Sequence, residues 1–138
     1  MDEENKELKE ALISFREIPD EENRKLVLAG LLEYLHHDQI LYIPVTGRQL
    51  PGGREQILTD KLINEKGDSF FTAFTDKSAA ARDRHCKRVL NLTLARIFNN
   101  VMKDDKVSGL ILNPYSPEQC TIFKDTIQML IEAEKQWR

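Results

Sequence analysis

The sequence predicts an α+β fold, in which two N-terminal helices and further helices pack on a mixed β-sheet. Two observations predict it: two helical segments come first, in residues 3–17 and 25–36, and short strand-type segments then alternate with helical ones. The composition, 41% hydrophobic and 31% charged, is typical of a soluble globular protein. A chain of 138 residues is long enough to bury a core, so we expect residues 1–138 to form a single domain.

The first two elements are predicted to be helices. Apolar residues at positions 8, 11, 12 and 15 follow the helical repeat, which predicts an amphipathic helix over residues 3–17. Pro19 interrupts it. A second helix is predicted through Lys25–His36, with Asp20, Glu21 and Glu22 in its first turn, where the helix dipole favours acids. Its leucine-rich stripe, which Leu26 widens, is suited to covering a sheet.

Strand-type segments follow. Residues 39–45 predict a short apolar strand, and Pro44 places its end at an edge or exit of the sheet. Residues 46–54 predict a polar loop of the hairpin or crossover kind, because its glycines and its one proline favour turns. Phosphate binding by this loop is the less favoured alternative, since the segment fits neither common glycine-rich phosphate motif.

A hairpin and a corner come next. Residues 56–64 and 69–75 predict two strands joined by a short loop that contains glycine. The second strand runs into Asp76, which is well placed as the N-cap of a short helix, Lys77–Arg84. The corner is therefore a strand that turns directly into a helix.

The C-terminal half continues the alternation. Residues 87–92 alternate as a strand, and Thr93 can cap the helix predicted from residue 94 to 102 by its apolar repeat. Residues 107–112 predict another strand, which ends at Asn113 and a proline.

Two interpretations are open for residues 119–124. Ser116 and Gln119 have the spacing of a capping box, and the apolar residues beyond them suit one long helix. Alternatively, Cys120–Phe123 is a short strand, and a final helix runs from about Asp125 to Trp137. Periodicity does not separate the two, and the β-branched and aromatic residues favour the strand.

Four stretches resemble a known family, and together they cover nearly the whole chain: LLEYLHHDQILYIPV, GDSFFTAFTDKSAAAR, RVLNLTLARIFNNVMKDDK and VSGLILNPYSPEQCTIFKDTIQMLI. In these stretches the chain resembles the SseB family, named for enhanced serine sensitivity, and in particular its N-terminal-type domain. The resemblance implies a compact α+β fold in a family without a firmly assigned chemistry. It therefore carries no catalytic residue over to this chain.

Charge and cysteine content argue against several classes of protein. The net charge of −3 is not that of a nucleic-acid-binding polycation, although residues 1–38 carry −6 and residues 39–138 carry +3. No apolar run approaches the roughly 18 residues of a membrane span, and the N-terminus is acidic, so we expect a cytoplasmic protein without membrane contact. Cys86 and Cys120 are expected to be free thiols, because two distant cysteines make no disulfide framework.

No metal or cofactor site is predicted. His36 and His37 are adjacent on a helix, so their side chains point about 100° apart and do not converge on one ion. They suit a helix end instead, where histidine is electrostatically favourable. His85 and Cys86 are likewise neighbours rather than a catalytic pair assembled from distant segments.

The segment 77–88 is strongly basic, with five bases against one acid. It lacks interleaved aromatic residues, so nucleic acid is not favoured as its ligand. A solvated helix end is the simplest interpretation. The alternative is an electrostatic seat, through Arg82 and Arg84, for a protein partner with an acidic surface.

The candidate binding site is the corner after two strands. If strands 69–75 and 107–112 are parallel neighbours, Thr75, Asp76, Asn113 and Tyr115 would border one shallow crevice, as polar groups often do where strands end. A catalytic Asp76 is less favoured, because no acid or histidine partner stands near it in sequence and capping already accounts for it.

These observations favour a non-catalytic cytoplasmic binding or regulatory module. The alternative is a small-molecule-binding enzyme or sensor that uses the corner near Asp76 and Asn113. A third class, a subunit of a homo-oligomer, rests on the expected exposure of Trp137 and on an edge strand at Pro44.

Overall fold

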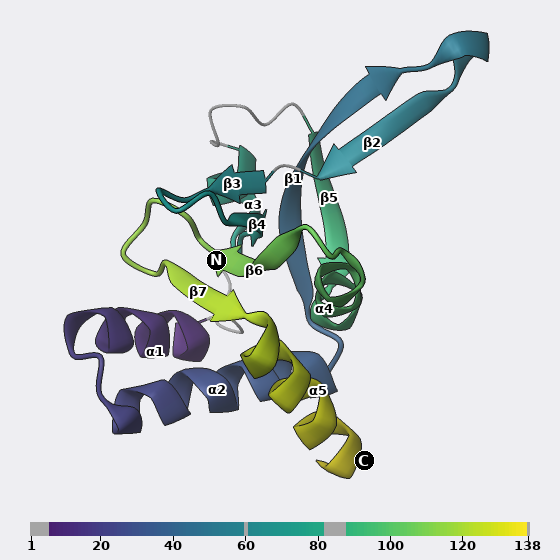
Figure 1. The fold of residues 1–138 in the computed structure, drawn as a ribbon. Coiled ribbons are helices and arrows are strands. Elements are labelled where there is room, and N and C mark those ends of the chain that lie inside the picture. Colours follow the sequence, from purple (N-terminus) through teal and green to yellow (C-terminus); the bar gives the residue numbers. More distant parts are fainter. Residues whose placement is uncertain (1–5, 60, 82–87, 138) are drawn as a thin grey trace.

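The computed structural model describes residues 6–59, 61–81 and 88–137 (Figure 1). Helices and strands are interspersed along the chain after two initial helices, which confirms the predicted α+β class. The elements are, in order, α1 (Lys6–Glu17), α2 (Glu21–His36), β1 (Ile40–Gln49), the 3₁₀ turn η2 (Pro51–Gly53), β2 (Glu55–Thr59), β3 (Lys61–Ile63), β4 (Ser69–Ala73), α3 (Lys77–Ala81), β5 (Arg88–Thr93), α4 (Leu94–Lys103), β6 (Val107–Leu112), β7 (Cys120–Phe123) and α5 (Lys124–Trp137).

The strands form two sheets where the sequence predicted one. The first sheet is antiparallel in the order β2-β1-β5, and the second has the order β3-β4-β6-β7 with β4 and β6 parallel. The division arises because residues 56–64, predicted as one strand, split between β2, which pairs with β1, and β3, which pairs with β4. A backbone bridge joins the sheets: the Tyr42 N–H donates to the Phe74 carbonyl at 2.9 Å, and the Phe74 N–H donates back at 2.8 Å.

Strand β1 corrects two predictions. Pro44 lies buried within this central strand, opposite Val89 of β5, and not at an edge or exit. The backbone nitrogens of residues 42 and 44 point toward the same edge of β1, the edge that pairs with β2 farther along the strand. Pairing with β2 begins only at Val45, so at Pro44 no neighbouring strand requires the backbone N–H that proline lacks. The strand also continues through residues 46–49, predicted as loop, because they pair with β2 in a hairpin that projects from the body of the molecule (Figure 1).

Local signals place the helix ends. Asp20 is the N-cap of α2, whose Asn23 N–H donates to the Asp20 carboxylate at 2.9 Å, and Glu21 and Glu22 lie in the first turn as predicted. Thr93 caps α4 as predicted, by accepting from the Arg96 N–H at 3.3 Å. Helix α2 ends at the histidine pair, as predicted.

The segment before α5 is a strand followed by a helix. Residues of β7 pair antiparallel with β6, and α5 begins directly after them at Lys124. Ser116 and Gln119 do not cap a helix but bond within the turn before β7, where the Gln119 N–H donates to the Ser116 carbonyl at 3.1 Å. Pairing with β6, which is not local in sequence, decides between the two interpretations.

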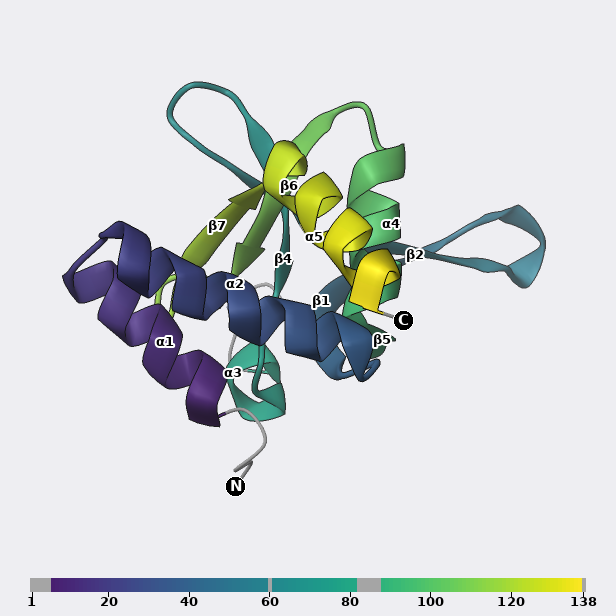
Figure 2. The same ribbon diagram turned by 90° about the horizontal axis from the view of Figure 1, so that it is seen from below.

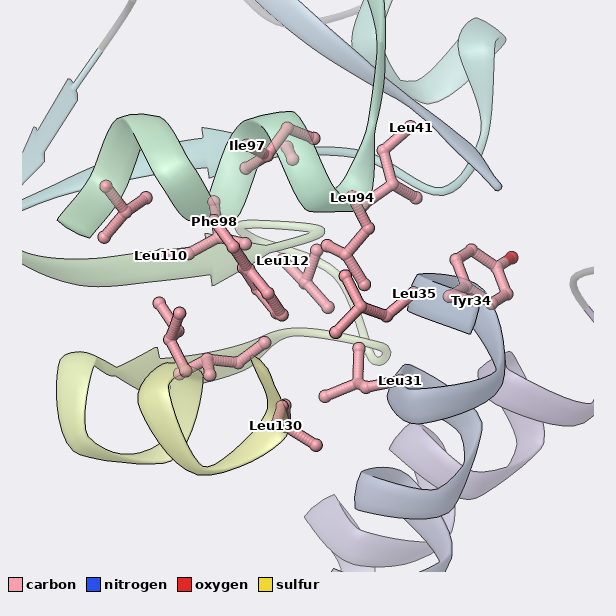
Figure 3. Close-up of a cluster of buried hydrophobic side chains, with 14 of the residues drawn as sticks. Leu31, Tyr34, Leu35, Leu41, Leu94, Ile97, Phe98, Leu110, Leu112 and Leu130 are labelled. Carbon is pink, nitrogen blue, oxygen red and sulfur yellow. The ribbon is translucent and has the colours of Figure 1, made fainter. Parts of the chain in front are cut away.

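Side chains from helices and both sheets share one buried cluster (Figure 3). Figure 2 shows α1, α2 and α5 on one side of the strands. Leu31 of α2 and Phe98 of α4 are almost fully buried, whereas Leu26 of α2 is 54% exposed and lies outside the stripe that the sequence assigned to it. No helix within the described residues combines the length and apolarity needed to cross a bilayer.

Candidate functional site

The corner residues meet because β4 and β6 are parallel neighbours. Ala73 pairs with Leu112 at the end of the two strands, and the Asn113 N–H continues the ladder by donating to the Ala73 carbonyl at 2.8 Å. Carboxyl ends of parallel strands lie at one edge of a sheet. Strands β4 and β6 are thus parallel neighbours, which is the arrangement that the predicted crevice required.

Asn113 ties the two strand ends together. Its side-chain Oδ1 accepts from the Thr75 N–H at 3.0 Å and from the Thr75 hydroxyl at 3.3 Å, and its Nδ2 donates to the Glu118 carbonyl at 3.5 Å. Both residues are buried, with Thr75 at 0% and Asn113 at 4% exposure. Buried polar groups that are hydrogen-bonded in this way fix a geometry, so the two residues shape the wall of the corner.

A cleft of about 360 Å³ opens at this corner. It is lined by the segment that follows β4, by α3, by the turn after β6 and by α1, which comes from the N-terminal part of the chain. The lining includes Thr75, Asp76, Asn113 and Tyr115, so the structure brings together the four predicted corner residues. Whether they bind a ligand stays a prediction.

Tyr115 stands at the mouth of the cleft, 84% exposed, with a φ of 65°. A bulky residue rarely adopts this left-handed conformation, and such strain persists only where neighbours hold it. The Tyr115 N–H donates to Gln119 Oε1 at 2.6 Å, and Arg16 of α1 donates to the next carbonyl, that of Ser116, at 2.6 Å. The turn is thus clamped from both sides, and it presents the phenol ring to solvent.

Asp76 supplies negative charge at the cleft. Its Oδ2 lies 3.6 Å from Lys9 Nζ of α1, and both side chains are partly exposed. Its backbone carbonyl accepts from the Ala80 N–H at 3.1 Å, which is the first turn of α3. Capping of α3 by the Asp76 side chain stays a prediction. The lining of the cleft therefore brings charges of both signs together, Lys9 with Asp76 and Glu118.

Sequence reasoning missed Lys9 as a member of the site. Lys9 occupies the polar face of an amphipathic helix, and no local pattern distinguishes it from a solvated lysine. Only the folded chain reveals its neighbour Asp76. The predicted residues Arg82 and Arg84 lie outside the described residues, as does Cys86, so their roles stay predictions.

The chemistry that the described residues can offer is mainly hydrogen bonding and aromatic contact. No group of three or more His, Cys, Asp or Glu within the described residues could hold a metal ion. Burial raises the pKa of the partly buried Cys120 thiol to about 11, so it is protonated at neutral pH and a weak nucleophile. In the cleft, the Ser116 hydroxyl donates to the Asn113 carbonyl at 2.8 Å and is engaged within the turn.

Fold and site define a two-sheet α+β domain with a polar cleft where two parallel strands end. A family model described as the SseB protein N-terminal domain matches residues 8–129. The chain therefore belongs to the SseB family, which confirms the resemblance noted from its segments. No curated protein and no solved structure matches the chain.

Proposed function

We propose that the chain is a non-catalytic cytoplasmic binding or regulatory module, and that a peptide segment of a partner protein binds at the corner cleft. The observation that carries the proposal is Tyr115, an exposed aromatic residue held in a strained conformation beside the cleft. Strained backbone concentrates at binding and switch sites, and tyrosine is enriched among the residues that dominate protein interfaces.

The chemistry of the corner indicates what the segment would contain. Tyr115 offers a flat ring with few rotatable bonds, which suits packing against an apolar side chain of the partner. Asp76 and Lys9 offer a carboxylate and an ammonium at the same mouth, so a polar or charged group should flank the apolar one. Cytoplasmic location accords with a free, partly buried Cys120.

The second candidate function is a small-molecule-binding enzyme or sensor. The observation that favours it is the size of the cleft, about 360 Å³, which lies in the range of roughly 300–1,000 Å³ usual for small-molecule sites. Asp76 is the acid that such a protein would use at this place.

Two sets of ligands test both functions: peptides selected from a displayed library and a library of small-molecule fragments. Each is titrated into the ¹⁵N-labelled chain, and the shifts of the backbone amides are followed. The proposal expects peptide hits that shift the amides of residues 75–76 and 113–116, and that are lost in Tyr115→Ala. Asp76→Asn should weaken the same hits, because it removes the charge and keeps the shape. Phe123→Ala is the matched control, since it removes an exposed ring on β7 away from the corner. Fragment hits at the corner without peptide hits would favour the second function, and hits elsewhere contradict both.

A second contact is proposed for the basic segment 77–88, which would seat an acidic surface. That surface can belong to another protein or to the acidic residues 2–22 of a second copy, which would make a homo-oligomer. Arg82→Glu with Arg84→Glu should weaken the association without unfolding the chain, and added salt should weaken it further. An association that ignores both changes must use another surface.

A further inference from the structure

A groove of about 500 Å³ runs between α1 and α2, on a surface distinct from the corner cleft. The two helices lie side by side in Figure 2. Leu8 and Tyr34, both buried, form its floor. A Cβ atom at Gly30 would lie 3.0 Å from Leu8 Cδ1, so the missing side chain lets the helices approach closely there. The close approach of the two helices at Gly30 therefore forms part of the groove.

The wall contributed by α2 includes uncovered apolar side chains. This helix carries apolar residues on more than one side: Val27 and Leu31 are buried in the core, whereas Leu26 is 54% exposed and Ala29 is exposed at the groove. Leu26 and Ala29 are therefore apolar side chains that no other element of the described chain covers at the groove.

The rim of the groove is acidic. Glu7 and Glu10 border it from α1, and Glu33 borders it from α2, all three exposed. No lysine or arginine stands among the described residues that line it. Charges of one sign around an apolar floor concentrate a negative potential, which attracts a cationic partner and repels an anionic one. The bilayer surface of anionic lipids is therefore a poor occupant.

We propose that this groove binds a basic amphipathic helix of a partner protein. Leucine-type side chains of that helix, spaced i, i+3, i+4 and i+7, would cover Leu26 and the floor at Leu8, and its lysines or arginines would meet the acidic rim. Along α1 the groove extends from Glu7 to Ser14, about 12 Å at 1.5 Å per residue, which accommodates two turns of a docked helix. This site is independent of the corner cleft.

A designed peptide tests the charge requirement. A fluorescent helix of about 18 residues, with leucine on one face and lysine on the other, is titrated with the full chain at low salt and the anisotropy is followed. We expect saturable binding that weakens with salt, and a Kd about tenfold higher for the double variant Glu10→Lys with Glu33→Lys. Glu65→Lys, an exposed reversal in the turn between β3 and β4, is the matched control and should leave the Kd within about twofold.

A second test distinguishes binding in the apolar groove from attraction between opposite charges alone. Leu26→Asn should raise the Kd by about tenfold, and a peptide of the same composition with a scrambled pattern should bind at least tenfold more weakly. Circular dichroism confirms that each variant is folded, and amide shifts should fall on α1 and α2. The proposal is overturned by absent binding, by equal binding of the scrambled peptide, by equal weakening in Glu65→Lys, or by tight binding to anionic vesicles at the same residues.

Discussion

The side chain of Asn113 is expected to hold the corner together, and its removal should destabilise the whole chain. In Asn113→Ala, the Thr75 N–H loses its acceptor at 3.0 Å while Thr75 stays fully buried. An orphaned buried donor costs about 1–3 kcal/mol. Residue 113 also has a φ of 49°, a left-handed conformation that asparagine tolerates but that costs most residues about 1–2 kcal/mol. The expected loss in the free energy of unfolding is about 2–5 kcal/mol.

Asn113→Gly separates the two contributions. Glycine removes the same hydrogen bonds but adopts positive φ freely, so its loss should be about 1–3 kcal/mol, smaller than that of the alanine variant. Urea unfolding measures both, with the fluorescence of Trp137, the chain's one tryptophan, as the signal. Its ring stacks on His36 at a centroid distance of 3.8 Å, so unfolding changes its surroundings.

Two results would refute this reasoning. If both variants lose less than about 0.5 kcal/mol, as surface substitutions usually do, the bonds between Asn113 and Thr75 do not stabilise the fold. If alanine and glycine lose equal amounts, the left-handed backbone at residue 113 stores no strain.

Three further predictions concern other elements. Gly109→Ala should lower the free energy of unfolding by several kcal/mol in the same urea assay, because the new Cβ would overlap the Ile122 carbonyl oxygen; an unchanged midpoint would contradict the close approach of β6 and β7. Hydrogen bonding to Arg88 lowers the pKa of Glu55, so this pair should stabilise the fold above pH about 4.3 and lose its effect as pH falls through the lowered pKa. Arg88→Gln should remove that pH dependence of the urea midpoint, and an unaltered profile would count against the pair. Burial raises the pKa of Cys120 to about 11, so its labelling by a thiol reagent should be slow until the chain unfolds, and rapid labelling of the folded chain would disprove the burial.

The sequence correctly predicted helices and strands that are determined by residues close together in the chain. Thr93 caps α4 because a hydroxyl three residues before a free N–H suffices, and residues 107–112 form a strand that ends at the turn signal Asn113-Pro114. The error at Pro44 has a non-local cause, since the unpaired side of β1 depends on where β2 begins. The same holds for residues 46–49, which become strand only because residues 55–59 pair with them. Partners distant in sequence were therefore the missing information.

The sequence could predict the corner site only on the assumption that strands 69–75 and 107–112 are parallel neighbours. Polar residues after two strands are visible in the sequence, so Thr75, Asp76 and Asn113 could be named. Strand order was not visible, and the parallel pairing of β4 with β6 is what brings these residues into one cleft. Lys9 could not be named at all, because its contact with Asp76 spans about half of the sequence.

Helix α1 shows why one periodic pattern carries less information than the folded helix. Its apolar repeat predicts the buried side, where Leu8 and Leu12 pack into the core. Two other sides of the helix contact different parts of the molecule, and the apolar repeat does not predict these contacts. Lys9 and Arg16, seven residues apart and so on one face, contact the corner, whereas Glu7 and Glu10, three residues apart, border the groove. Both sides are polar, so hydropathy does not distinguish them. They become different surfaces because the turn after β6 lies beside one side and α2 lies beside the other.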